Sequence, residues 1–195
     1  MLALGDYIQI PKQLLYEYEV NEEWLLHDSH LHGLGHMTRV FILQELICEQ
    51  LERQGIAFDR MATRWATSVH DVGRVDDGLD LDHGKRSAEW MKSNVPATMS
   101  PDTLDIATYI VHWHVPHDDE APVMTTELKV MKDADGLDRV RLGDLDESYL
   151  RTAPAKSMVE VARQLWEASL PSNPNENESF QSVVAAAIKL GLVKA

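Results

Sequence analysis

Histidine and aspartate residues recur in one order through the first two thirds of the chain. His70 and Asp71 are adjacent, His36 precedes them by about the length of one long helix, and Asp135 closes the series. Neutral imidazoles and carboxylates are the ligands that hold hard or borderline divalent metals. An adjacent His-Asp pair can direct two donors at one metal only where the backbone bends, or where the aspartate bridges two ions. The order therefore predicts a site for one or two ions of Mn, Fe, Co, Ni, Zn or Mg.

The helices that would position these residues are indicated by apolar periodicity. From Gly35 onward, Val40, Leu43, Ile47 and Leu51 recur at three- and four-residue steps, which is typical of an amphipathic helix. Further helices are expected near residues 11–15, 22–26, 60–71, 83–94, 101–114, 123–135, 155–170 and 179–192. Alternating β-branched runs are scarce, so the sequence predicts an all-α protein. Donors from separate helices can converge inside a helical bundle.

Two capping signals mark the helices that carry candidate ligands. Asp59 is a suitable N-cap for the helix that leads to His70-Asp71, and Ser100-Pro101 is typical of a helix start. The glycine- and aspartate-rich stretch 73–78 interrupts the helical pattern. We therefore expect the His-Asp pair to lie at the end of a helix.

Composition limits the classes of function that the chain can have. The 195 residues are 44% hydrophobic and 26% charged, as in globular proteins, and are enough for one domain with a sizeable core. Eighteen lysines and arginines against 32 acidic residues give a formal net charge of −14. This balance argues against a nucleic-acid polymer as partner, because binding to a phosphate backbone requires a basic face. A small phosphorylated substrate remains compatible with it, because a metal neutralises phosphate charge locally.

The sequence also favours a cytoplasmic location. The N-terminal residues lack the basic region of a signal peptide, and no run of 18 apolar residues predicts a membrane span. The single cysteine, Cys48, excludes an intramolecular disulfide and fits a reducing compartment.

Several short motifs surround the candidate ligands and occur in one order. They are HGxxHxxRV at His32–Val40, HDVGR at His70–Arg74, HGxxSA at His83–Ala88, a histidine-rich segment before a proline, and DADGLDR at Asp133–Arg139. With these motifs the chain resembles the HD-domain superfamily of metal-dependent phosphohydrolases over roughly residues 31–142. The resemblance implies an all-helical HD bundle in one domain, residues 1–195, with the N-terminal lead-in and the C-terminal helices packed on this core. It also implies that the metal ligands are His36, His70, Asp71 and Asp135.

A second metal is an open possibility at this point. Superfamily members with two metals carry another histidine after the HD pair, which His83 matches, and one more before the final aspartate. His112 and His114 are the candidates for the latter, and because residues two apart on a helix point about 200° apart, only one would face the site. The segment WHVP, which ends at Pro116, is similar to a WHxxP-like pattern of the resembling family, and this similarity favours His114.

The implied reaction is hydrolysis of a small phosphate ester, such as a nucleotide or a related metabolite, by a metal-activated hydroxide. With two metals, Asp71 would bridge them. Charge on the phosphoryl oxygens requires cationic partners. Arg74 is the first candidate, because HDxxK/R recurs in the resembling family, and Lys85 and Arg139 follow. Asp138 would either orient Arg139 or form a surface pair.

Other interpretations stay open. A subset of the superfamily consists of di-iron oxygenases, which the surplus of histidines would suit. A metal- or nucleotide-binding module without catalysis is a further alternative, although the complete ligand set disfavours it. His32 lies one turn before His36, and we expect it to support the site or cap the helix. His117, beyond the proline, is expected to face solvent.

Overall fold

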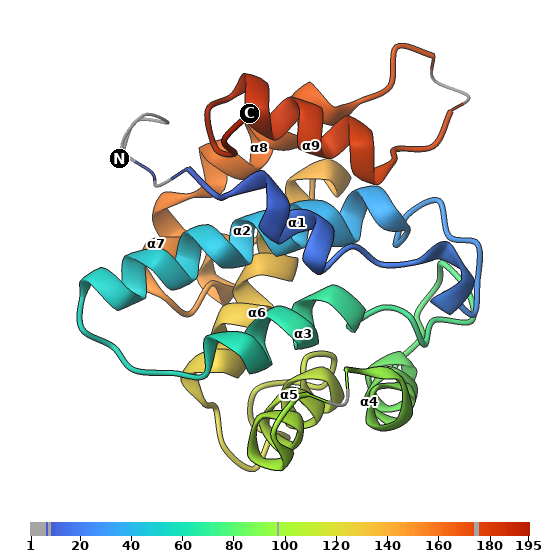
Figure 1. The fold of residues 1–195 in the computed structure, drawn as a ribbon, viewed down its shortest axis with the longest axis vertical. Coiled ribbons are helices and arrows are strands. Elements are labelled where there is room, and N and C mark those ends of the chain that lie inside the picture. The colour runs from blue at the N-terminus through green and yellow to red at the C-terminus, as the bar shows by residue number, and fades with distance from the viewer. Residues whose placement is uncertain (1–6, 8, 97, 174–175) are drawn as a thin grey trace.

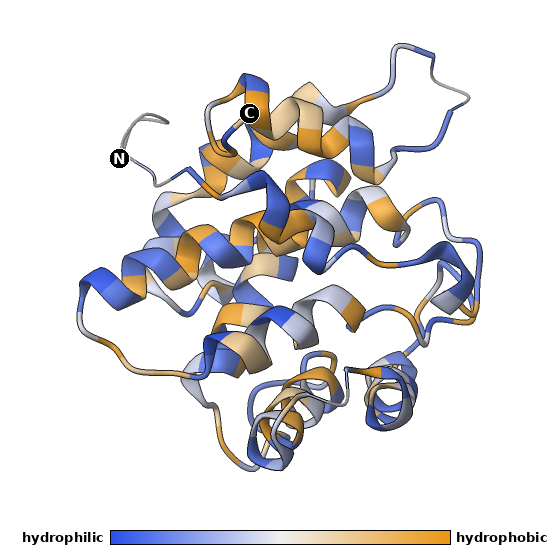
Figure 2. Ribbon diagram, in the orientation of Figure 1, coloured by the Kyte–Doolittle hydropathy of each residue, from blue (hydrophilic) through white to orange (hydrophobic). Residues whose placement is uncertain are grey.

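Helix α2 (Leu34–Arg53) runs through the centre of the fold (Figure 1). The computed structural model describes residues 7, 9–96, 98–173 and 176–195. Of the 20 residues in α2, 16 are buried, so neighbours enclose this helix on all sides. Hydrophobic and hydrophilic residues alternate along it (Figure 2), and the structure therefore buries polar positions as well as the apolar stripe that the sequence predicts.

The other helices surround α2 in two groups. Helices α3 and α6 pack on α2, and α5 packs against both α3 and α4 at one end of the molecule (Figure 1). At the opposite end, α8 and α9 pack on each other and on α2. Their bounds are α1 (Lys12–Glu17), α3 (Arg60–Val69), α4 (His83–Asn94), α5 (Pro101–Trp113), α6 (Thr126–Asp138), α7 (Ala153–Ser157), α8 (Val159–Ser169) and α9 (Phe180–Lys189). Short 3-10 helices lie at η2 (Glu22–Trp24), η3 (Arg139–Leu142) and η4 (Glu147–Tyr149).

The prediction of an all-α fold is confirmed. Within the described ranges, β pairing is limited to one isolated bridge between Ile10 and Val193, which ties the two ends of the chain together. In the same part of the chain, no helix combines the length and the apolar character that crossing a membrane demands.

The predicted caps begin the helices that carry candidate ligands. The Asp59 side chain accepts a hydrogen bond of 2.9 Å from the Ala62 N–H at the start of α3. Ser100 caps α5 in the same way, with Pro101 in the first turn. Helix α3 ends at Val69, so the adjacent His-Asp pair lies in the turn that follows the helix, as the sequence predicts.

Two glycines allow α4 to approach this turn and α5 closely. A Cβ on Gly73 would lie 2.5 Å from the backbone nitrogen of Ser87, whose hydroxyl accepts a hydrogen bond of 2.8 Å from the Gly73 N–H. A Cβ on Gly84 would lie 2.7 Å from the Val111 carbonyl oxygen and 3.1 Å from Cε1 of His114. Only glycine fits both contacts, because no side-chain carbon can approach backbone atoms so closely.

A buried ion pair joins α2 to α3. The Glu45 carboxylate is 2% exposed and accepts hydrogen bonds from Arg64 Nε at 2.8 Å and from Arg60 Nη2 at 2.9 Å. Burial alone would raise the pKa of Glu45, but the two guanidinium groups outweigh this effect and hold that pKa below its ordinary value. The carboxylate is therefore charged in the folded protein over the whole neutral range.

Replacement of Glu45 by glutamine should destabilise the protein by about 1–3 kcal/mol near neutral pH. Because the folded-state pKa of Glu45 is lowered, its charge stabilises the fold above the unfolded pKa, and this contribution disappears as the pH falls through the folded pKa. The stability difference between wild type and E45Q in urea unfolding should therefore hold from about pH 7 to about pH 5 and shrink between about pH 5 and about pH 3. The control is E52Q, since Glu52 pairs with Arg60 from an exposed position. An unchanged difference across this range would contradict the assignment.

Candidate metal centre

Four imidazoles and two carboxylates meet between α2 and the helices that follow it. His36 lies in the first turn of α2, His70 and Asp71 follow α3, and Asp135 lies on α6. Two more histidines complete the set, at the start of α4 and at the end of α5: His83 and His114. All of these side chains are buried except that of Asp135, which is 38% exposed.

The first donor group consists of His36, His70, Asp71 and Asp135. Nε2 of His36 lies 3.3 Å from Nε2 of His70 and 3.4 Å from Oδ1 of Asp135. Oδ2 of Asp71 lies 3.5 Å from Nε2 of His36 and 3.6 Å from Nε2 of His70. Ligand atoms about 2.1 Å from one metal ion lie roughly 3.0–3.4 Å from one another in tetrahedral or octahedral geometry. The spacing of this group therefore fits a single divalent ion.

The second donor group consists of Asp71, His83 and His114. Nε2 of His83 lies 3.0 Å from Oδ1 of Asp71 and 3.0 Å from Nε2 of His114. Nε2 of His114 lies 4.0 Å from the same carboxylate oxygen. Asp71 thus offers one oxygen to each donor group, which is the arrangement of a carboxylate that bridges two ions.

The four histidines are oriented by the same device. Nδ1 of His70 lies 2.7 Å from the Thr67 carbonyl oxygen, and Nδ1 of His114 lies 2.6 Å from that of Val111. Nδ1 of His83 contacts the Asp80 carbonyl oxygen, and Nδ1 of His36 lies 2.7 Å from Asp138 Oδ2. Because carbonyl oxygens and the ionised Asp138 carboxylate can only accept, Nδ1 carries the proton in each ring, and Nε2 is directed into the site. The rings are therefore prepared to bind metal through Nε2.

The electrostatics of the first donor group favour a positive charge. Burial opposes protonation of His36, but its contacts with Asp135, Asp138 and Asp71 outweigh burial and raise its pKa to about 10. Burial would also raise the pKa of Asp135, yet the neighbouring imidazoles, His36 above all, hold it well below its ordinary value. The carboxylates of Asp71 and Asp135 therefore stabilise a positive charge next to Nε2 of His36.

The second donor group has a different character. Burial, reinforced by the neighbouring imidazoles, lowers the pKa of His114 to about 3. His114 is therefore neutral near physiological pH, which is the protonation state that a metal ligand requires.

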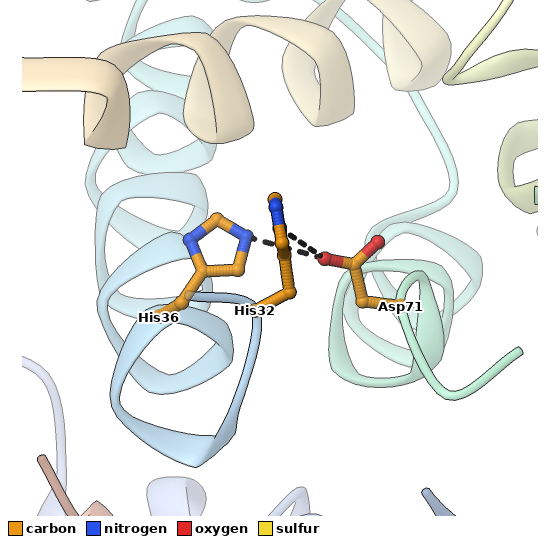
Figure 3. Close-up of side chains that lie close together, drawn as sticks. All are labelled: His32, His36 and Asp71. Carbon is orange, nitrogen blue, oxygen red and sulfur yellow. Dashed lines mark hydrogen bonds and ion pairs between the residues drawn. The ribbon is translucent and has the colours of Figure 1, made fainter. Parts of the chain in front are cut away.

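His32 is closer to the donors than the sequence indicates. Its Nδ1 lies 3.0 Å from Oδ2 of Asp71, and its ring meets that of His36 edge to face at 5.4 Å (Figure 3). Burial lowers the pKa of His32 in spite of the contact with Asp71. Neutral His32 can donate its Nδ1 proton to Asp71 and so help to orient the shared carboxylate, and with His36 and Asp71 it also forms a group whose spacing could hold a metal ion.

Asp138 was not recognised from the sequence as part of the site. Both roles expected for it, to orient Arg139 or to form a surface pair, are wrong: Asp138 is fully buried and contacts Nδ1 of His36, and Arg139 pairs with Asp144. The Arg39 guanidinium donates to both Asp138 oxygens, at 2.6 and 3.0 Å. Asp135 and Asp138 are one helical turn apart on α6 and so face His36 together. That three-residue spacing was the signal for this role.

Two predicted site residues lie elsewhere. His112 is half-buried with its ring centroid 4.7 Å from that of Trp113, and it belongs to neither donor group. Lys85 is on the exposed side of α4. Burial is the main cause that lowers the pKa of His112, and the positive charge of Lys85 adds to it. The reason is helix geometry, because His112 and His114 leave α5 in different directions.

The remaining predicted cations lie near the site. Nε of Arg74 is 3.3 Å from Oδ1 of Asp71, and its Nη1 donates to the carbonyl oxygens of Asp76 and Gly78. Arg74 therefore supports the shared carboxylate and the loop that follows it. Arg139 is half-exposed and lines a cleft beside Asp135.

This cleft opens onto both donor groups and has a volume of about 730 Å³. Its inner wall includes Asp135 and His114, and its sides carry three cationic residues, Lys132, Arg139 and Arg151. Asp118 fixes two of these: Lys132 Nζ lies 3.1 Å from it, and Arg151 donates two hydrogen bonds to it, at 2.8 and 2.7 Å. The cleft is therefore a path by which a small molecule can reach the donors.

Comparison with known proteins agrees with this geometry. The family model described as HD domain matches residues 33–140, more than half of the chain. The matched span contains every member of the two donor groups. No match was found among curated proteins or among solved structures.

Metal content tests the two donor groups. His83→Ala should reduce bound divalent metal from two ions per chain to one, because the second donor group loses a central ligand. His112→Ala is the matched control, since this neighbouring histidine lies outside both groups, and it should retain both ions. Inductively coupled plasma mass spectrometry of manganese-loaded protein gives the counts. Loss of an ion from H112A, with two ions kept by H83A, would reverse the assignment.

The close contact at Gly84 allows an independent test. Gly84→Ala should force α4 away from α5, separate His83 from His114 and destabilise the fold by about 1–3 kcal/mol. Gly136→Ala is the control, because a Cβ there meets only Leu150 Cδ2 at 3.7 Å, and alanine favours the helix. Thermal unfolding and metal content of the two variants should therefore diverge. Equal stability and equal metal content would contradict the role given to Gly84.

Proposed function

The chain belongs to the HD domain family, and on that premise we propose that it is a metal-dependent phosphohydrolase acting on a small phosphate ester such as a nucleotide. The observation that carries the proposal is the Asp71 carboxylate, which offers one oxygen to each of two donor groups. Adjacent divalent ions joined by a carboxylate are typical of enzymes that hydrolyse phosphate esters. The exposure of Asp135 to the cleft supports access for such a substrate.

The donor set and its spacing fit divalent ions of the Mn, Fe, Co, Ni, Zn or Mg class. His36, His70, Asp71 and Asp135 would hold one ion, and Asp71, His83 and His114 would hold the other. When bound, such ions activate water and neutralise charge on phosphoryl oxygens. The chain itself keeps the histidines in the tautomer that binds through Nε2, and it keeps water away from every donor except Asp135.

The cleft residues would orient the substrate. Arg139 is half-exposed and pairs with the half-exposed Asp144, whereas Lys132 and Arg151 are more buried, so Arg139 can turn toward a phosphoryl oxygen at small cost. Lys132 and Arg151 are held by Asp118 and would contribute positive potential from fixed positions. Charge-assisted hydrogen bonds of this kind position phosphate groups.

The size and the walls of the cleft support a substrate larger than a simple phosphate monoester. Tyr149, which is 66% exposed, lies at the cleft with Leu145 and Leu150. An aromatic ring beside aliphatic side chains can stack on a flat base or another apolar leaving group. A nucleoside phosphate matches this combination, and the formal net charge of −14 disfavours a polymer in its place.

Phosphate release tests the proposal. Protein loaded in turn with Mn, Co, Ni, Zn, Mg or Fe should hydrolyse at least one member of a panel of nucleotides and phosphate esters, and Asp135→Asn should abolish the activity. Arg139→Gln should raise KM by about threefold to tenfold with less effect on kcat. Arg163→Gln, which removes an exposed arginine far from the cleft in sequence, is the control. Oxygen consumption without phosphate release would favour the oxygenase alternative, and nucleotide binding without turnover would favour the binding module.

A further inference from the structure

A second cavity, of about 150 Å³, is lined by His36, whose Nδ1 contacts Asp138, and by Arg39 and Arg141. It shares no lining residue with the cleft described above. Its walls come from the loop before α2, the first turns of α2, the 3-10 helix η3, α8 and the segment before α9. We propose that this cavity, which we call the Arg141 cavity, binds a small oxyanion of the size of phosphate or sulfate. The proposal is independent of the catalytic function proposed above.

The first observation is the uncapped start of α2. Gly33 occupies the N-cap position and has no side chain to accept a hydrogen bond. Within the described residues, the backbone N–H groups of Leu34, Gly35 and His36 donate no hydrogen bond, and Gly35 and His36 line the cavity. Such N–H groups together with the dipole of a 20-residue helix attract an anion.

The second observation is the Arg141 side chain, which is 8% exposed and lines the same cavity. Its Nε donates to Asp138 Oδ2 at 3.0 Å. Its two Nη atoms have no hydrogen-bond partner in the part of the chain that the structure describes. These atoms are not among the fully buried unpartnered atoms of the described residues, so their N–H groups are accessible and can donate to an acceptor in the cavity that Arg141 lines. An oxyanion in the cavity would accept from Arg141 and from the α2 amides at once.

The size and polarity of the cavity limit the ligand. A space of this volume holds several waters, and therefore a phosphate or sulfate ion, but it is far smaller than the cleft. Trp166 and Leu142 provide apolar wall, and Arg39 is already engaged by Asp138, Ser169 and Glu178. Of the two arginines among the described residues that line the cavity, Arg141 is thus the one whose Nη atoms have no partner.

Glu178 allows a second test, in which the expected change in anion affinity is opposite to that for Arg141. Its carboxylate pairs with Arg39 and lies over the start of α2, where a Cβ on Gly35 would be 2.8 Å from Oε2. This negative charge lines the cavity and repels an anion. Removal of the charge should therefore strengthen anion binding, whereas removal of Arg141 should weaken it.

Isothermal titration calorimetry of metal-loaded protein with inorganic phosphate, and separately with sulfate, tests this inference. Wild type should bind one oxyanion that Arg141→Gln weakens by about tenfold or more, because two charge-assisted hydrogen bonds are lost. Glu178→Gln should tighten the same binding by about threefold. Glu176→Gln is the matched control for charge, because Glu176 lies two residues away and outside the cavity lining.

Two further results keep the outcome decisive. Arg139→Gln, in the cleft, should leave the Arg141-sensitive binding unchanged, which separates it from any phosphate bound at the catalytic centre. If R141Q fails to fold or loses metal, the comparison of E178Q with E176Q decides. Equal affinity of E178Q and E176Q, undiminished binding by folded R141Q, or absence of Arg141-sensitive binding in wild type would overturn the proposal.

Discussion

The shared, buried carboxylate of Asp71 is the interaction on which the rest of the site depends. Its side chain is 3% exposed, and each of its oxygens faces a different cluster of imidazoles. A carboxylate removed from water is costly unless cations or hydrogen-bond donors surround it. Neutral histidines can supply only part of that compensation. The close packing at Gly73 and Gly84 follows from this requirement, because it brings α4 and α5 near enough to present His83 and His114 to Asp71.

A second buried carboxylate, that of Asp138, joins the residues behind His36. Asp138 receives hydrogen bonds from His36, Arg39 and Arg141, which come from α2 and η3. His36 therefore lies between two acidic groups, with Nε2 toward Asp71 and Nδ1 toward Asp138. Arg39 and Arg141 balance the negative charge of Asp138. The carboxylate of Asp71 faces mainly imidazoles and Arg74. The need for further positive charge is therefore concentrated on the side of the site where the donor groups meet.

The sequence predicted the parts of this structure that depend on local signals. Caps at Asp59 and Ser100 placed the starts of two helices, and the turn after α3 placed the His-Asp pair at a helix end. Contacts between distant residues were harder to predict. Asp138 contacts His36, which is 102 positions away in the sequence, and local helix periodicity cannot predict such a contact. Helix periodicity showed that His112 and His114 diverge, but only the packing of α5 against α4 decides which one faces Asp71.

The two donor groups differ in how the fold supports them. The first group is carried by α2, α3 and α6, which pack on one another at the centre of the molecule. The second group takes His83 from α4, which, among the helices of the described residues, packs mainly on α5. Elements with few packed neighbours open at lower free energy than the core does. The first donor group is thus held by helices that pack on one another, and the second is completed by a peripheral helix whose position depends on its close contacts at Gly84 and Gly73.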